Sequence, residues 1–152
     1  MTPSPGGTLS WVGQIAGTTA QRVACDADVT VVAVDERGAT RVVRREPRFF
    51  PWPQRKGMIA RDGDRCVIPF CDRPVSWADG HHIVPVELGG PTTIDNGALP
   101  CAAHHALLHE GHWTLRRLPD GRYQVIRPDG RTIGPEPHPP GHNRPPPFHH
   151  RE

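Results

Sequence analysis

The sequence predicts a small α+β fold that metal ions stabilise alongside a modest apolar core. The apolar fraction is 36%, and 19 prolines and 16 glycines make the chain rich in loops. The remaining segments form short strand and helix patterns, and cysteines and histidines stand between them at metal-ligand spacing. A chain of 152 residues is at most one ordinary domain with extensions. A core this small usually needs additional stabilisation, and a bound metal ion is a common source of it.

The N-terminal third predicts a weak helix followed by a hairpin. The helix is expected over Thr8–Val23, although two glycines interrupt it. The residues of Val29–Val34 and Thr40–Arg44 are typical of two paired strands, and Asp35–Gly38 between them is typical of a turn. The sequence FFPWP at residues 49–53 then breaks the chain.

The middle of the chain predicts short elements around a turn-rich knuckle, and the C-terminus predicts disorder. Residues 134–152 are rich in proline and histidine and are expected to form no packed structure. The expected elements before them are a helix over Pro53–Arg61, a knuckle at DGDRCVIPFCDRP, a strand at SWADGHHIVP, a loop at LGGPTTIDN, a helix over Ala102–Glu110 ended by Gly111, and a second hairpin that turns at Pro119–Gly121.

Composition also bounds the compartment of the protein. No apolar run approaches the roughly 20 residues of a membrane span. The N-terminus, MTPSPGGTLSWVG, lacks the charged and long apolar regions of a signal peptide, so we expect a cytoplasmic protein with no membrane partner. In a reducing compartment, the four cysteines indicate a metal site before disulfides.

The distribution of charge favours a polyanionic partner. Eight basic residues and one acid, Glu46, lie between Arg37 and Arg61. Seventeen of the eighteen basic residues are arginine, whose planar guanidinium suits phosphate. A solvated basic face explains the charge alone equally well.

Three cysteines and one histidine predict a structural zinc site. Cys66 and Cys71 bracket a four-residue turn, and Cys101 and His104 are three apart at the start of a helix. Three sulfurs and one imidazole form a tetrahedral set typical of closed zinc sites. The alternative is that these cysteines are small buried apolar residues. Cys25 stands alone and is expected to be a core or near-surface thiol.

A second group of ligands consists of histidines. His105 and His109 are four apart, so they share a helix face, and His104 is rotated from His105 by roughly 100°. The helix can therefore carry ligands toward two sites. With His81 from the preceding strand, the second site has three protein ligands and leaves positions open, as catalytic metal sites do.

His82 is then free for a different task. An imidazole titrates near neutral pH and can act as the general base for a water that attacks phosphorus. Each histidine alone could be an ordinary hydrogen-bonded residue, and His112 is interpreted that way. His81, His82, Asn96, His105 and His109 in this order favour catalysis.

These motifs resemble a known nuclease pattern. CVIPFC, DGHHIVPVELGG, DN and CAAHH, followed by His109, resemble the HNH endonuclease motif of ββα-metal (His-Me finger) nucleases. Cys25–Gly130 is similar to the C-terminal nuclease part of bacterial HNH proteins that carry an upstream helical domain of unknown function. The resemblance implies that 1–50 is a remnant of the upstream region, 51–133 the nuclease module with its C-terminal hairpin, and 134–152 a tail.

The resemblance also implies a role for each residue. One divalent ion, magnesium, manganese or nickel, would serve hydrolysis of double-stranded DNA. Because nothing in the sequence resembles a recognition helix, we expect weak sequence preference. The implied roles are His82 as general base, Asn96 as the residue that holds the intervening loop, His81, His105 and His109 as ligands of the catalytic ion, Cys66, Cys71, Cys101 and His104 as zinc ligands, Asp79 as an orienting residue, and Arg55, Lys56 and Arg61 as contacts to the DNA backbone.

Two features depart from the pattern. Gly97 follows Asn96, where an apolar residue is usual. The upstream helical domain is almost wholly missing, so we expect a truncated fragment of a longer protein. Two other functions therefore stay open: a zinc-stabilised DNA-binding module without catalysis, and a small zinc domain that binds protein.

Overall fold

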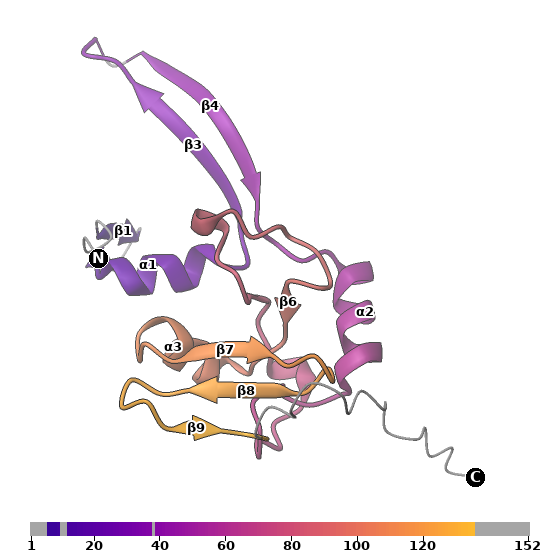
Figure 1. Cartoon of the computed structure of the whole chain (residues 1–152). Helices are drawn as coiled ribbons and strands as arrows, with labels where there is room; N and C mark the ends of the chain where they lie inside the picture. Colours follow the sequence, from indigo (N-terminus) through magenta and orange to yellow (C-terminus); the bar gives the residue numbers. More distant parts are fainter. Residues whose placement is uncertain (1–5, 10–11, 38, 136–152) are drawn as a thin grey trace.

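The structure is a computed structural model that describes residues 6–9, 12–37 and 39–135. Within these ranges it contains three α-helices and four small antiparallel sheets, so the predicted α+β class is confirmed (Figure 1). The predicted disordered tail lies almost wholly outside the described residues.

The N-terminal segment differs from its prediction. Strands β1 (Gly7–Leu9) and β2 (Gly13–Ile15) pair with each other, and helix α1 (Gly17–Ala24) starts only after them. The prediction of a helix over Thr8–Val23 was therefore wrong in its first half. Gly13 has a φ of +93°, a conformation that glycine adopts readily and an α-helix does not allow.

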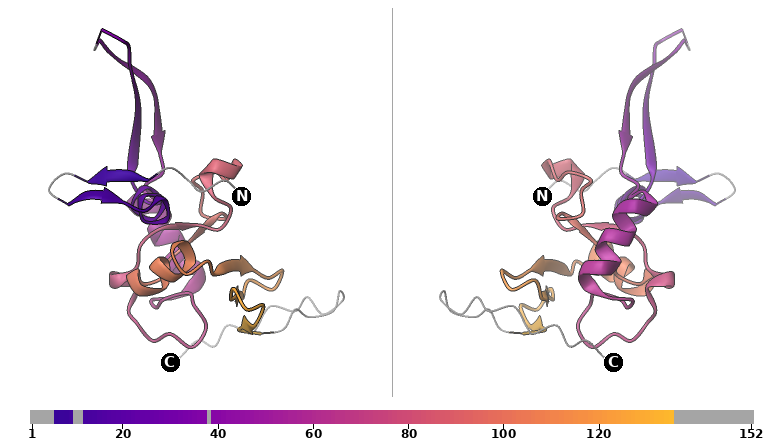
Figure 2. Two further views of the ribbon diagram at one scale, coloured as in Figure 1. Left: turned by 90° about the vertical axis from the view of Figure 1, so that its left-hand side faces the viewer. Right: turned by 90° about the vertical axis from the view of Figure 1, so that its right-hand side faces the viewer.

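The predicted first hairpin is present and longer than expected. Strand β3 (Asp28–Val34) pairs antiparallel with β4 (Thr40–Pro47), and the register shifts between Val31 and Val32. At its tip, the Asp35 carboxylate accepts the backbone N–H groups of Arg37 and Ala39. The hairpin projects away from the rest of the molecule (Figures 1 and 2).

Helix α2 (Trp52–Asp62) matches its prediction within one residue at each end. Pro51 precedes it and Gly63, with a φ of +96°, ends it. The buried Met58 of α2 packs with Phe50 and Leu99 in a small apolar cluster.

The central segment folds around two very short strands. β5 (His81–His82) pairs with β6 (Gly97–Ala98), so that His81 lies opposite Ala98 and His82 opposite Gly97. The strand predicted over SWADGHHIVP was too long, because its start forms the 3-10 helix η1 (Val75–Trp77) and Pro85 at its end leads into a second one, η2 (Val86–Leu88). Helix α3 (Ala102–His109) follows β6 and ends one residue before its predicted end.

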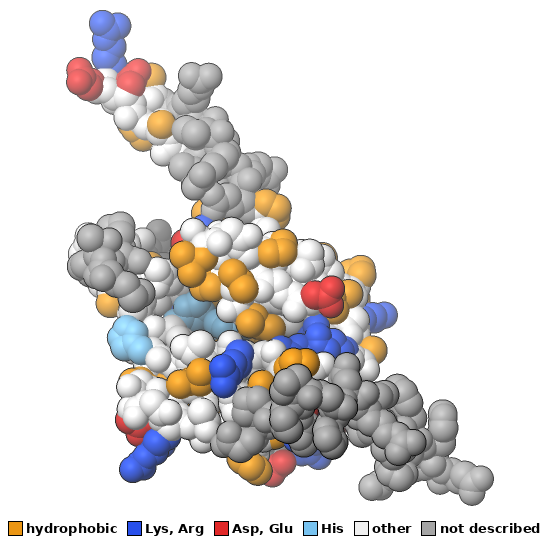
Figure 3. Space-filling model, in the orientation of Figure 1, with side chains coloured by type: hydrophobic (Ala, Val, Ile, Leu, Met, Phe, Trp, Pro, Cys, Tyr) orange, Lys and Arg blue, Asp and Glu red, His pale blue; other side chains and the backbone are white. Residues whose placement is uncertain are grey.

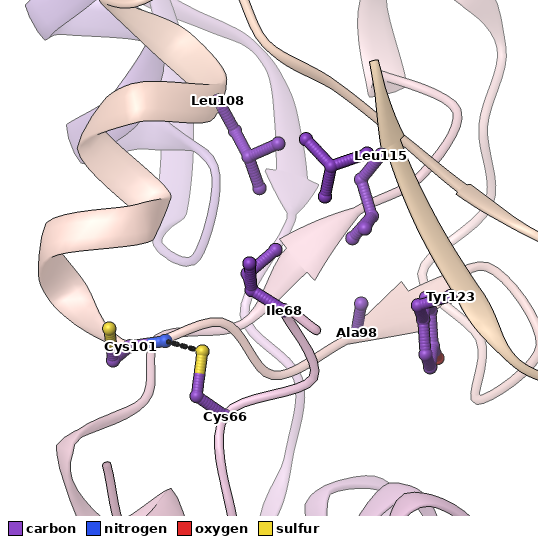
Figure 4. Close-up of a cluster of buried hydrophobic side chains, with 8 residues drawn as sticks. Cys66, Ile68, Ala98, Cys101, Leu108, Leu115 and Tyr123 are labelled. Carbon is purple, nitrogen blue, oxygen red and sulfur yellow. Dashed lines mark hydrogen bonds between the residues drawn. The ribbon is translucent and has the colours of Figure 1, made fainter. Parts of the chain in front are cut away.

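A three-stranded sheet closes the main core. It consists of β7 (Thr114–Arg117), β8 (Tyr123–Ile126) and β9 (Thr132–Ile133), and its first two strands form the predicted second hairpin. Its buried side chains pack against the knuckle and α3, as Figure 4 shows for Leu115, Ile68 and Leu108. Cys66 and Cys101 belong to the same buried cluster.

Candidate functional site

Three histidine side chains from β5 and α3 face one another. The ring centroids of His81 and His105 are 5.4 Å apart, those of His81 and His109 are 5.2 Å apart, and those of His105 and His109 are 4.8 Å apart. Each pair of rings meets edge to face. His81 and His105 are buried, and His109 is half-buried. The structure thus brings together three imidazoles that are 28 residues apart along the chain at the most.

The nitrogen atoms of this group suit a cation. The Nε2 atoms of His105 and His109 are buried and have no hydrogen-bond partner. The Nδ1 of His105 lies 3.2 Å from Oδ2 of Asp79, so that nitrogen carries the proton and Nε2 carries the lone pair. Buried polar atoms rarely lack a partner, and two such atoms beside a third imidazole are the donors a divalent metal would use.

Burial keeps these imidazoles neutral. It lowers the pKa of His81 well below its usual value, and the neighbouring imidazoles add to the effect. Burial also lowers the pKa of His105, although Asp79 opposes this, and it lowers the pKa of His109 to about 4. Neutral imidazole is the form that binds metals.

Cys25 joins this group, which the sequence reasoning did not find. Its thiol is buried, and its Sγ and one nitrogen of each of the three histidines all lie within 4.8 Å of one another. Burial raises the pKa of Cys25 to about 11. Cys25 is 56 residues from His81, and no spacing rule relates a lone cysteine to a motif that distant.

His82 is buried on the other side of Cys25. Its exposed fraction is 2%, and its ring packs against Phe50 with centroids 4.4 Å apart. Its Nε2 lies 2.9 Å from Oγ1 of Thr92, and that hydroxyl donates its own proton to the carbonyl of Pro47.

The second ring nitrogen of His82 faces Cys25. Nδ1 lies 3.7 Å from the Sγ of Cys25, and the Nδ1 of His81 lies 3.9 Å from the same sulfur. Burial lowers the pKa of His82, although a hydrogen bond to the backbone of Cys25 opposes this. The imidazole is thus neutral and basic at neutral pH.

Asn96 fixes the loop between β5 and β6. Its Oδ1 accepts the N–H of Val84, and its Nδ2 donates to the carbonyls of Val84 and Pro91. Gly90 makes this possible, because a Cβ at that position would lie 1.8 Å from the carbonyl oxygen of Val84.

The sulfur-rich group assembles at the knuckle. Cys66, Cys71, Cys101 and His104 place one ligand atom each within 4.8 Å of one another. The Nδ1 of His104 is 3.3 Å from the Sγ of Cys101 and 3.6 Å from that of Cys66. Burial raises the pKa of Cys66 to about 12. Burial opposes ionisation of Cys101 too, but hydrogen bonds from the His104 backbone N–H, Cys66 and Arg73 outweigh it and lower its pKa.

The three basic residues expected to contact DNA have different environments. Arg55 forms an ion pair with Asp26 and donates to the carbonyl of Ala78. Arg61 pairs with Asp62 and donates to the hydroxyl of Tyr123. Lys56 is exposed and lies over the ring of Trp52.

Charge on the visible surface is dispersed. On the face in Figure 3, the blue basic side chains lie in separate groups, and histidine side chains in pale blue reach the surface. None of the helices in the described part of the chain is long and apolar enough to cross a membrane.

Comparisons with known proteins found a matching family model and two similar proteins. Residues 65–111 match the family model described as HNH endonuclease. The chain is also similar to two curated proteins of Mycobacterium tuberculosis, "Uncharacterized protein Rv1128c" of strain ATCC 25618 / H37Rv and "Uncharacterized protein MT1160" of strain CDC 1551 / Oshkosh. No solved structure gives a significant match.

The similarity to these relatives covers a minor part of their length. The first is 30% identical over 97 residues, which is 64% of this chain and 21% of the relative. The second is 30% identical over 90 residues, which is 59% of this chain and again 21% of the relative. The chain thus spans about a fifth of the length of the relatives it matches.

Proposed function

We propose that the protein is a metal-dependent endonuclease that hydrolyses phosphodiester bonds of double-stranded DNA, because residues 65–111 match the HNH endonuclease family model. The observation that carries the proposal is the pair of buried, unpartnered Nε2 atoms on His105 and His109 beside His81. A module that only binds nucleic acid does not need buried imidazole nitrogens without hydrogen-bond partners, whereas a site for a catalytic ion needs such nitrogens as ligands. The arrangement of β5, β6 and α3 supports a ββα-metal core.

His82 is the proposed general base. Its Nε2 contacts the Thr92 hydroxyl and its Nδ1 faces Cys25, and the ring nitrogen that carries no proton is the atom that would accept one from the attacking water. The ring is held by Phe50 and Thr92. A fixed, neutral imidazole is suited to remove a proton at neutral pH.

Asn96 and Asp79 position the catalytic groups. The three hydrogen bonds of Asn96 join Val84 and Pro91 across the loop that follows His82. We propose that this fixed loop keeps the His82 imidazole in one orientation. Asp79 holds the proton of His105 on Nδ1 and leaves Nε2 directed at the ion.

His81, His105 and His109 would hold the divalent ion, for which magnesium, manganese and nickel are the candidates. When bound, such an ion neutralises charge that develops on the phosphate and the leaving oxygen. The Cys66, Cys71, Cys101 and His104 group would hold a structural zinc.

The DNA contact is proposed to be a backbone grip without strong sequence preference. Among the three basic residues named for it, Lys56 is the exposed one. The arginines of Arg37–Arg48, on and beside the projecting β3–β4 hairpin, add positive charge in the sequence. Phosphate contacts of this kind position a protein on DNA but carry no sequence information. We also propose that the protein acts in the cytoplasm.

A second candidate function, a zinc-stabilised DNA-binding module without catalysis, is favoured by one observation. His82 is only 2% exposed, and both of its ring nitrogens already have neighbours, Thr92 and Cys25. A base that water cannot reach would be inactive. Salt-sensitive DNA binding without cleavage would identify this function.

Nicking of supercoiled plasmid separates the two functions. We expect cleavage with magnesium, manganese or nickel, and a loss of about 10²- to 10⁴-fold in His82→Ala, the usual contribution of a general base. His112→Ala is the matched control, because His112 is exposed and lies outside both ligand groups. Undiminished cleavage by His82→Ala, with zinc content and melting temperature unchanged, would contradict the assignment of the base.

A further inference from the structure

We propose that Cys25 is a fourth ligand of the ion held by His81, His105 and His109. The centre would then have one thiolate and three imidazole ligands, a set that prefers zinc, nickel or cobalt to magnesium. This inference rests on the proposed metal centre and specifies the class of ion that the centre takes.

The sulfur lies where a fourth donor is needed. One donor atom from each of the four residues falls within 4.8 Å of the others. His105 is 2% exposed and its Nε2 has no partner, so an unsatisfied buried donor is directed into the same space. Tetrahedral sites with mixed nitrogen and sulfur ligands are characteristic of zinc and related ions.

Two tethers, one on each side along the chain, hold Cys25 over α3. On the N-terminal side, α1 lies against α3, and Arg22 forms an ion pair with Glu110 at 2.7 Å. The partly exposed pair alone is weak, but it acts together with the packing of the helices.

The second tether is Asp26, the residue after Cys25. Its carboxylate accepts the backbone N–H groups of Phe50 and Gly80 at 3.0 and 2.8 Å, and it pairs with Arg55. Gly80 directly precedes His81. The Asp26 carboxylate therefore couples the position of Cys25 to the strand that carries the histidine pair.

Packing of an apolar residue does not account for Cys25. Neither of the two clusters of buried apolar side chains in the described structure includes it. Its polar neighbours include the Nδ1 atoms of His81 and His82, 3.9 and 3.7 Å from its Sγ, and the backbone of His82. A thiol that lies next to imidazole nitrogens is in a position from which it can bind the same ion.

The donor set determines the choice of ion. Magnesium prefers oxygen ligands and octahedral geometry, and it gains little from a thiolate or imidazole. Cys25 also lies outside residues 65–111, so the fourth donor would come from a segment beyond the part that matches the nuclease family.

Cobalt absorption tests the inference on the full chain. Metal-free wild type, Cys25→Ser and the control Val23→Ala, which changes an exposed side chain of α1, are titrated with Co²⁺. Wild type and control should bind two equivalents through four thiolates. Cys25→Ser should lose about a quarter of the near-ultraviolet thiolate-to-cobalt absorption and bind the second equivalent at least about tenfold more weakly. Equal absorption in Cys25→Ser would overturn the inference.

If Cys25→Ser does not fold, a measurement on the wild-type protein alone still tests the inference. X-ray absorption of protein with two bound Zn²⁺ should give an average of about two sulfurs per zinc with Cys25 as a ligand, and about 1.5 without it. The outcomes separate this inference from the nuclease proposal. A sulfur count near two without plasmid nicking supports the ligand and refutes the nuclease; nicking with a count near 1.5 does the reverse.

Discussion

His105 is oriented by Asp79: the Nδ1 of the buried imidazole lies 3.2 Å from Oδ2 of a carboxylate that is 46% exposed. The contact joins α3 to the segment before β5, and it selects the tautomer of His105 whose Nε2 is free to bind an ion. A carboxylate, a histidine and a metal in this order form a common second-sphere arrangement.

Removing the Asp79 carboxylate should weaken the metal centre. We expect Asp79→Ala to lower the affinity for the ion in the histidine site by about 10- to 100-fold, and Asp79→Asn to lower it less, because the amide oxygen still accepts the Nδ1 proton. Competition with a coloured chelator measures the affinity. Asp129→Ala is the control, since the Asp129 side chain is also 46% exposed but lies in the β8–β9 turn. Equal affinity in wild type and Asp79→Ala would refute the orienting role.

Loss of the structural zinc should unfold the knuckle. Cys66 and Cys101 are buried in the same cluster as Ile68 and Leu115. Without the metal, the cross-link that these cysteines would provide to that cluster is lost. Binding of structural zinc is worth about 10–16 kcal/mol in small zinc domains, more than the stability of a typical domain. We expect chelator-treated protein and Cys66→Ser to lose cooperative melting followed by circular dichroism.

The control for this experiment lies beside the zinc ligands. Asp72→Ala removes a side chain that is 95% exposed and adjacent to Cys71, and it should keep the wild-type melting curve. A cooperative transition in metal-free wild type would show that the apolar core suffices.

A methyl group at Gly90 should disrupt the loop that Asn96 holds. Its Cβ would lie 1.8 Å from the Val84 carbonyl oxygen and 2.8 Å from the Asn96 Nδ2. We expect Gly90→Ala to lower the free energy of unfolding by about 1–3 kcal/mol, as overpacking does, and to reduce nicking.

The neighbouring glycine provides the comparison. Gly89 has a φ of +86° and open space around its Cβ position, and asparagine tolerates that backbone region. Gly89→Asn should therefore change stability, measured by urea denaturation, much less than Gly90→Ala does. Similar losses in the two variants would mean that the Val84–Asn96 contact is not the cause.

Acid should destabilise the protein through its buried histidines. Burial lowers the pKa of His109 to about 4, below the value near 6.5 of an unfolded chain. Between these two values the unfolded chain binds a proton that the folded chain excludes, so stability is full above pH 6.5 and falls as the pH decreases toward 4.

A variant isolates the contribution of His109. In samples that carry one equivalent of zinc, enough for the sulfur-rich site alone, the unfolding free energy of His109→Leu relative to wild type should rise steadily as the pH is lowered from 7 to 5, because leucine does not titrate. Urea denaturation at several pH values measures the difference, and acid release of zinc, common to both proteins, cancels. A difference that does not change with pH would refute the burial argument.

Residue spacing was enough to predict the groups whose geometry is local. Cys101 and His104 are three apart and His105 and His109 four apart, so the turn of one helix places each pair on a common face, and α3 carries them so. The bracket of Cys66 and Cys71 around a short turn is local in the same sense. Sequence patterns express such relationships because the backbone alone enforces them.

The distant residues that lie beside these groups became apparent from the folded chain and not from residue spacing. Cys25 lies 3.9 Å from the Nδ1 of His81 because Asp26 is bound to Gly80, a contact between residues 54 positions apart. Arg55, a candidate for DNA by its charge, is paired with that same Asp26. Contacts of this kind depend on how α1, α2 and β5 dock, and docking follows from the packing of the whole chain, which no local spacing encodes.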